Sequence, residues 1–235
     1  MTDLTPLDGP RRAPSGGDPT KSIVLLLHGY GADGNDLIGL ADYWQKDFPE
    51  TLFLAPHAPE RCELSPFGRQ WFSLDKYDPD LQRRDPKAGA QVFELMREGV
   101  EQARRNVDQF LQTELERCNL SMKDVGFVGF SQGTMVSLFT GLRENVAPAG
   151  ILGYSGAMIS ASRLSQEITS RPPVCLVHGE QDDVVPFTAM GACETALKDA
   201  GIAVTSHSRP GLGHGIDEGG LDIGRHFLMS IFANV

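Results

Sequence analysis

The sequence predicts an α/β fold with a mostly parallel central sheet that helices cover on both faces. Short apolar runs alternate with longer segments of helical periodicity from residue 22 to the end of the chain. Runs that are apolar at nearly every position are typical of strands buried on both faces of a parallel sheet. No repeat or linker-like stretch divides residues 21–235, so one domain is expected there. Residues 1–20 are expected to form a flexible tail, or an edge strand around residues 4–7.

Strands and helices are expected in the following places. The strand candidates are residues 22–27, 51–55, 125–130, 150–154, 174–177 and 203–208. The helix candidates are residues 36–46, 87–117, 132–143, 187–200 and 217–232. The helix at 87–117 has the clearest period, since apolar residues such as Val100, Val107 and Leu115 recur at helical spacing. Its expected start is Asp85 followed by Pro86, an N-cap acceptor before a residue that lacks the donor.

Composition and charge argue against two classes of partner. The 235 residues carry a formal net charge of −10, whereas proteins that bind nucleic acid carry clustered positive charge. No apolar run approaches the ~20 residues of a membrane span, and residues 1–20 lack the apolar core of a secretion signal. The cysteines show no C-x-x-C spacing, which fits a reduced cytoplasmic protein better than a disulfide framework. No metal motif such as H-E-x-x-H occurs.

A serine stands where one buried strand is expected to give way to a helix. The stretch GFSQG, residues 129–133, matches G-x-S-x-G, a sharp turn that lifts the serine hydroxyl above the carboxyl ends of the strands. Glycine is needed on both sides because side chains there would collide with the neighbouring strand and helix. The backbone N–H of Gln132 faces the same space and can donate to an oxyanion. The pentapeptide alone is equally typical of an N-cap serine, but the flanking strand and helix favour Ser131 as a nucleophile.

A serine hydroxyl needs a base to become a nucleophile, and later strand ends supply the candidates. The expected order is serine, then an acid, then histidine. Asp182 and Asp183 follow a strand, their side chains must diverge, and spacing leaves the choice between them open. Among the later histidines, His207 lies within a strand and His226 within the last helix. His214, on a glycine-lined loop, is therefore the candidate base.

A glycine-rich loop after the first buried strand offers a second oxyanion donor. The loop reads HGYG from residue 28, and glycine lets the backbone approach a ligand closely, so the N–H of Tyr30 is expected to donate. We interpret His28, and likewise His57 and His178, as residues that brace loops through hydrogen bonds rather than as bases.

Residues 56–85 interrupt the alternation of strands and helices. A loop of this length in a compact domain is usually functional or disordered, and its aromatic residues Trp71, Phe72 and Tyr77 argue against disorder. We therefore expect this segment to cover the site.

Taken together, these motifs resemble the phospholipase/carboxylesterase group of α/β-hydrolases, which includes the acyl-protein thioesterases and small bacterial carboxylesterases. The likeness covers residues 21–235 and rests on LLHGYGADGNDL, GFSQG, HGEQDDVVP and GLGHGI in that order, with RQWF between the first two. It implies an α/β-hydrolase fold without a large cap domain. It also implies a triad of Ser131, Asp182 and His214, with oxyanion donors at Tyr30 and Gln132.

The resemblance further implies an acyl pocket bordered by Trp71 and Phe72, and we expect Val184 to contribute to its shape. Two features depart from the group. Thr134 stands where many relatives carry another glycine, and the oxyanion loop reads GYGADGND rather than the GLGD of the eukaryotic thioesterases. Both favour the bacterial esterase branch over a protein depalmitoylase.

The expected function is hydrolysis of carboxylic esters of short to medium acyl chains by a serine carboxylesterase, through an acyl-enzyme and with neither cofactor nor metal. An acyl-protein thioesterase or a lysophospholipase is the nearest alternative, because thioesters and oxyesters reach the same tetrahedral intermediate. A non-catalytic ligand-binding relative would usually lack a triad member. Nothing predicts the cap that would screen peptides for a peptidase. The expected partner is a small-molecule ester, and aromatic side chains near an open site would support a weak homodimer.

Overall fold

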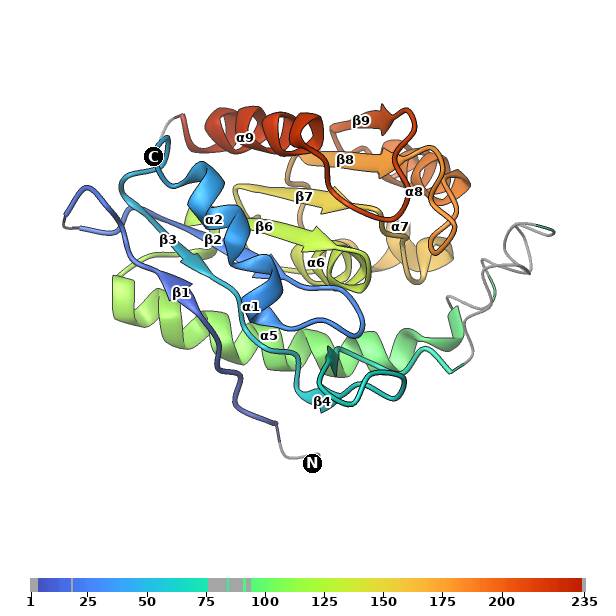
Figure 1. Ribbon diagram of the computed structural model, residues 1–235, viewed down its shortest axis with the longest axis horizontal. Coiled ribbons are helices and arrows are strands. Elements are labelled where there is room, and N and C mark those ends of the chain that lie inside the picture. Colours follow the sequence, from blue (N-terminus) through green and yellow to red (C-terminus); the bar gives the residue numbers. More distant parts are fainter. Residues whose placement is uncertain (1–3, 18, 76–83, 85–90, 92–93, 234–235) are drawn as a thin grey trace.

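The structure is a computed structural model that describes residues 4–17, 19–75, 84, 91 and 94–233. Among these residues a seven-stranded sheet runs through the centre, and helices lie on both of its faces (Figure 1). The strands of this sheet are β1 (Arg11–Arg12), β2 (Ser22–Leu27), β3 (Thr51–Leu54), β6 (Val125–Phe130), β7 (Gly150–Tyr154), β8 (Val174–Gly179) and β9 (Val204–Arg209). A separate hairpin pairs β4 (Glu60–Arg61) with β5 (Arg69–Gln70).

The strand order is β1-β3-β2-β6-β7-β8-β9. Every neighbouring pair is parallel except β1 and β3, which pair antiparallel at one edge. The predicted α/β fold with a mostly parallel sheet is therefore confirmed. Parallel pairing brings the carboxyl ends of β2, β6, β7 and β8 to the same edge of the sheet, and ligands of such sheets bind at that edge.

Two layers of helices bury the sheet. The helices are α1 (Gly34–Leu37), α2 (Gly39–Trp44), α5 (Arg97–Cys118), α6 (Gln132–Gly141), α7 (Leu164–Glu167), α8 (Thr188–Asp199) and α9 (Glu218–Phe232), with 3-10 turns at Met122–Asp124 and Ala161–Arg163. Successive side chains of a strand point to opposite faces. On β2, Ile23 and Leu25 accordingly pack in the cluster with α5, α6 and α8, whereas Val24 and Leu26 pack with α1, α2 and α9.

Several boundaries differ from the sequence prediction. The single helix expected at 36–46 is divided at Ile38, which ends α1 and precedes α2. The helix expected at 87–117 is described as α5 from Arg97, and its proposed start at Asp85 and Pro86 lies outside the described residues. It ends where Asn119 takes a left-handed conformation with φ of 54°.

The first segment of the chain forms its edge strand at Arg11–Arg12 rather than around residues 4–7. An edge strand pairs through its backbone, so its side chains give little signal. Pro6 also lacks a donor for such pairing. Leu7 instead packs against the core from the surface. No separate cap domain stands over the sheet within the part of the chain that the structure describes.

Candidate active site

Ser131 occupies a strained turn between β6 and α6. Its φ of 54° and ψ of −116° lie in a region that residues with a side chain seldom adopt. The flanking glycines are sterically required. A Cβ at Gly129 would lie 2.4 Å from the backbone nitrogen of Thr134, and a Cβ at Gly133 would lie 1.8 Å from the carbonyl oxygen of Leu27. The sharp turn that the GFSQG sequence predicts is thus present, at the carboxyl edge of the sheet.

Asp182 lies in the loop after β8 and accepts hydrogen bonds on both carboxylate oxygens. Its Oδ2 accepts a hydrogen bond from the ring nitrogen Nδ1 of His214, at 2.8 Å. Its Oδ1 accepts hydrogen bonds from the backbone N–H groups of Val184, at 3.0 Å, and Val185, at 2.8 Å. The ring nitrogen Nε2 of His178 lies 3.2 Å from Oδ2. The structure thus brings Asp182, rather than its neighbour Asp183, to His214.

These donors hold Asp182 in its ionised form. Burial, the largest single influence, raises the pKa of this carboxyl. Hydrogen bonds from the rings of His178 and His214 and from the backbone N–H of Val185 outweigh burial, so the pKa of Asp182 falls well below its usual range. A carboxylate that stays charged can fix the imidazole tautomer with hydrogen on Nδ1, which leaves the lone pair of Nε2 available as a base.

The loop that carries His214 is docked on the loop that carries Asp182. The backbone N–H of Gln181 donates to the carbonyl of Leu212 at 2.9 Å, and a Cβ at Gly179 would lie 2.4 Å from that same oxygen. The ring of Phe130, the residue before Ser131, packs against the ring of His214 with centroids 4.9 Å apart. His214 is thereby placed beside the strained turn. Within the described residues, the Ser131 hydroxyl and Nε2 of His214 have no hydrogen-bond partner.

The two expected oxyanion donors belong to adjacent backbone segments. A Cβ at Gly29 would lie 3.3 Å from the Cβ of Ser131, so the loop that holds Tyr30 passes directly beside the serine. In the described part of the chain, the backbone N–H groups of Tyr30 and Gln132 have no acceptor. The loop is fixed from its other side, where the N–H of Gly31 donates to the carbonyl of Arg69 at 2.9 Å.

The side chain of Gln132 ties the nucleophile turn to the segment that contains Trp71 and Phe72. Its amide oxygen accepts from the N–H of Trp71 at 2.9 Å, and its amide nitrogen donates to the carbonyl of Phe72 at 2.8 Å. The indole N–H of Trp71 donates to the carbonyl of His28 at 2.9 Å. Both aromatic side chains are almost fully buried, whereas Val184 is 44% exposed. Tyr77 lies outside the described residues.

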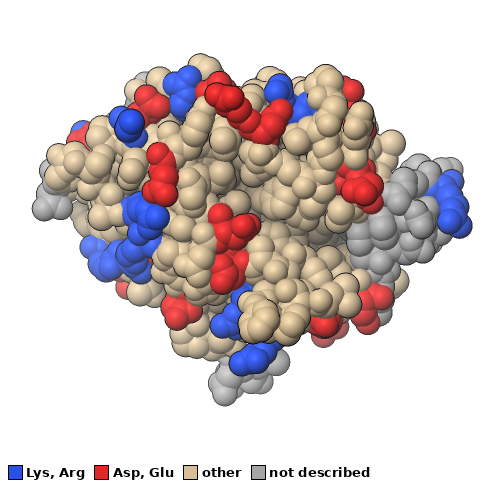
Figure 2. Space-filling model, viewed as in Figure 1, with Lys and Arg blue, Asp and Glu red and all other residues tan. Residues whose placement is uncertain are grey.

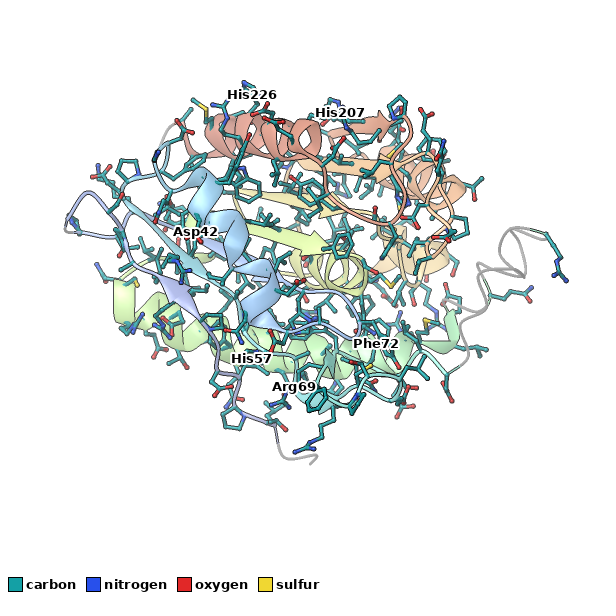
Figure 3. All side chains as sticks on the ribbon, in the orientation of Figure 1. Asp42, His57, Arg69, Phe72, His207 and His226 are labelled. Carbon is teal, nitrogen blue, oxygen red and sulfur yellow. The ribbon has the colours of Figure 1, made fainter. Side chains whose placement is uncertain are left out.

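The remaining histidines either form hydrogen bonds with backbone groups or lie on elements away from the serine. His28 donates through one ring nitrogen to the carbonyl of Gly29 and accepts from the N–H of Ala58 through the other. Burial lowers its pKa to about 4, so it is neutral. His57 accepts from the N–H of Gly34. His207 and His226 lie on β9 and α9, along the upper edge of the view in Figure 3.

Sequence reasoning missed three contacts of the site. It did not pair His178 with Asp182, although histidine four residues before the acid was a visible signal. It did not place the ring of Phe130 against His214, and it assigned only the backbone of Gln132. The contacts of the Phe130 ring and of the Gln132 side chain join segments that are distant in the chain, so local patterns give no sign of them.

The surface agrees with the acidic composition. On the face shown in Figure 2, acidic side chains are widely spread, and the most prominent group of basic side chains lies to the left, where Figure 1 places β1. Among the described helices, none combines the length and apolar character needed to cross a bilayer.

Comparison with known proteins places this geometry in one family. Residues 12–231 match the phospholipase/carboxylesterase family. The chain is 26% identical to acyl-protein thioesterase 1 of Emericella nidulans over 207 residues, which cover 83% of this chain and 84% of the relative. It is 26% identical to esterase YpfH of Escherichia coli over 199 residues, or 85% and 78% of the two chains. The crystal structure of esterase PE8 superposes with a TM-score of 0.87 at 38% identity, over 97% of this chain and 100% of that one. The chain therefore belongs to the phospholipase/carboxylesterase family and is a hydrolase of the esterase type.

Proposed function

We propose that this chain is a serine carboxylesterase that hydrolyses carboxylic esters of short to medium acyl chains through an acyl-enzyme on Ser131. The 2.8 Å hydrogen bond between His214 and the ionised Asp182, beside the strained turn of Ser131, carries the proposal. An alcohol, an imidazole and a buried carboxylate, with the imidazole bonded to the carboxylate, are the parts that nucleophilic acyl transfer needs.

In the proposed reaction, Ser131 Oγ attacks the acyl carbonyl while Nε2 of His214 takes the hydroxyl proton. Asp182 stabilises the imidazolium that forms, and His214 then returns the proton to the departing alkoxide. Water repeats the sequence on the acyl-enzyme, with His214 again as base, and releases the carboxylic acid. The serine hydroxyl, the imidazole and water supply every proton that moves.

The N–H groups of Tyr30 and Gln132 hold the oxyanion of the tetrahedral intermediate. The loss of one such donor typically costs ~3–4 kcal/mol of transition-state stabilisation. The side-chain bonds of Gln132 to Trp71 and Phe72 hold the donor and the acyl pocket in one rigid unit. The indole N–H of Trp71 donates to the carbonyl of His28, beside the oxyanion loop, and this contact supports Trp71 and Phe72 as the border of an acyl pocket for short to medium chains, to whose shape the half-exposed Val184 contributes.

An acyl thioesterase is the second candidate, because acyl-protein thioesterases from several fungi align with most of this chain. The higher identity to esterase PE8 favours oxyesters. Lysophospholipids, whose acyl bond is an oxyester, are a further substrate class that the same proposed chemistry accommodates.

The proposal is tested by a p-nitrophenyl ester series from acetate to palmitate, alongside acyl thioesters and lysophosphatidylcholine. We expect the highest kcat/KM for oxyesters of short to medium acyl length. Ser131→Ala should reduce kcat by a factor on the order of 10⁶ while the circular dichroism spectrum stays unchanged. Faster thioester turnover would select the second candidate. Undiminished turnover by Ser131→Ala would refute the assigned nucleophile, and inactivity of the native chain towards every substrate would support a ligand-binding relative.

We also propose a cytoplasmic location and a weak homodimer. Cys62, Cys118, Cys175 and Cys193 are all free thiols, which supports a reducing compartment. Phe67, 95% exposed at the β4–β5 hairpin, supports weak self-association. Esterase activity in the cytosolic fraction and a concentration-dependent sedimentation coefficient are the expected results. Activity in the culture medium, or a sedimentation coefficient independent of concentration, would contradict them.

A further inference from the structure

Two imidazole rings meet at a single carboxylate oxygen in this structure. Oδ2 of Asp182 lies 2.8 Å from Nδ1 of His214 and 3.2 Å from Nε2 of His178. His214 comes from the loop after β9, whereas His178 is the penultimate residue of β8 and lies four positions before Asp182. The side chains of His178 and Asp182 are almost completely buried. The contact is therefore shielded from solvent, where a hydrogen bond to a charged group has its largest effect.

The contacts of His178 fix which of its nitrogens carries hydrogen. Nε2 lies 2.8 Å from the backbone carbonyl of Val185, and a carbonyl oxygen can only accept. Nε2 must therefore be protonated, and the nitrogen that donates to the carbonyl of Val185 also lies 3.2 Å from Oδ2 of Asp182. The same short turn donates the N–H of Val185 to Oδ1 of Asp182. His178 thus fastens both the carboxylate and the turn that holds it.

The surroundings of the His178 ring are otherwise uncharged. Phe187 presents its ring edge-on at a centroid distance of 6.0 Å, and Met190 and Cys193 of α8 line the same small cavity as His178. Burial raises the pKa of the Cys193 thiol to about 12, so it stays neutral. From β9, the uncharged Ser208 is the residue in register with His178. Among the described residues in contact with this ring, Asp182 is the one that carries charge, and His214 shares its oxygen.

We propose that His178 is a positioning residue of the catalytic machinery, whose Nε2–H holds Asp182 in place for His214. This inference rests on the proposed function. A donor on Oδ2 withdraws negative charge from the oxygen that faces His214. Removal of that donor should therefore make His214 a stronger base and, at the same time, leave the carboxylate less firmly oriented. His178 touches no substrate, so these effects should fall on kcat and on the pH profile rather than on KM.

The test compares pH–rate profiles for p-nitrophenyl butyrate hydrolysis by the native chain, His178→Phe and His178→Gln. Phenylalanine keeps a planar ring but has no donor, whereas the amide nitrogen of glutamine can take the place of Nε2. His178→Phe is expected to lower kcat about tenfold and to move the acid limb of kcat/KM up by about half a pH unit, with KM unchanged. His178→Gln should restore both kcat and the limb. His207→Phe, a histidine replacement on the neighbouring strand β9, is the matched control and should leave the profile unchanged.

The proposal would be overturned if the acid limb of kcat/KM lay at the same pH in the native chain and in folded His178→Phe. A loss of kcat that His178→Gln fails to restore would also overturn it. If His178→Phe does not fold, ¹⁵N NMR of the native histidines decides the matter. We expect hydrogen on Nε2 of His178 across the pH range in which activity rises, and hydrogen on Nδ1 instead would refute the inference. Ser131→Ala distinguishes a failure of the proposed function from a failure of the inference about His178. Undiminished turnover by Ser131→Ala would refute the proposed function, whatever His178 does.

Discussion

Two acidic sites of this protein shift the pKa of their carboxyl groups in opposite directions. Asp182, at the carboxyl edge of the sheet, has donors on both oxygens, and its pKa lies well below the usual range. Asp108 on α5 and Glu144 after α6 share the guanidinium of Arg104, at 3.2 Å and 3.7 Å respectively. Burial first, and then the charge of Asp108, raises the pKa of Glu144 to about 7.

The difference shows that burial alone does not set the charge of a carboxyl group. Asp182 is the more deeply buried acid, yet its donors more than offset the cost of desolvation. At the other site, one oxygen each of Asp108 and Glu144 is buried without a donor among the described residues, and burial raises the pKa of both carboxyls. The arrangement at Asp182 suits a catalytic acid that must stay ionised. The arrangement at Asp108 and Glu144 makes the stability of the fold depend on pH.

The largest effect expected from this comparison is on catalysis. Asp182→Asn should lower kcat by a factor on the order of 10⁴, because the amide no longer fixes the His214 tautomer or stabilises its charged form. Glu144→Gln, the matched loss of a partly buried carboxylate, should change kcat less than about twofold. Steady-state kinetics with p-nitrophenyl butyrate measures both. Similar losses in the two variants would show that Asp182 has no special role.

An added methyl group should destabilise the fold more when it lies near Ser131 than when it lies on the exposed surface of a helix. A Cβ at Gly156 would lie 2.4 Å from the Cβ of Thr134, whereas a Cβ at Gly191 in α8 would meet nothing within 4 Å. Gly156→Ala is expected to lower the free energy of unfolding by ~2–3 kcal/mol, and Gly191→Ala to raise it by ~0.5–1 kcal/mol. Urea denaturation measures both changes.

The side chain of Thr134 and the bare glycine at position 156 occupy complementary space. The hydroxyl of Thr134 donates to the carbonyls of Gly129 and Tyr154, at 2.8 Å each. Its side chain occupies space that glycine at positions 153 and 156 leaves free. Thr134→Gly combined with Gly156→Ala should therefore be less destabilised than the sum of the single variants, by about 1 kcal/mol or more. Strict additivity would contradict this account.

The smallest expected effect concerns the dependence of stability on pH. The pKa of Glu144 rises from 4.5 to about 7 on folding, so the folded chain binds more protons than the unfolded chain between these values. Stability contributed by Glu144 is therefore full below pH ~4.5 and is lost as pH rises through about 7. Glu144→Gln should lose less of its urea midpoint than the native chain between pH 5 and pH 8. An identical loss in both proteins would refute the raised pKa.

The sequence predicted the sheet and the sharp turn at Ser131 well, because both depend on local patterns. Apolar runs such as residues 125–130 mark buried strands, and GFSQG brings its steric demands with it. The choice between Asp182 and Asp183 could not come from spacing, since adjacent side chains differ only in the direction they face. The packing of the Phe130 ring against His214 and the bonds of the Gln132 side chain join distant segments, so spacing gives no sign of them. The roles of Trp71, Phe72 and Val184 towards substrate remain predictions.

The central claim is that Ser131 forms a covalent bond to the acyl group with the help of Asp182 and His214. Rapid mixing with p-nitrophenyl acetate, followed by acid quenching and peptide mass spectrometry, tests it most directly. We predict a burst of p-nitrophenol and one acyl group on the peptide that contains Ser131, with neither in Ser131→Ala. An acyl group on a different residue, or full turnover by Ser131→Ala, would contradict the account.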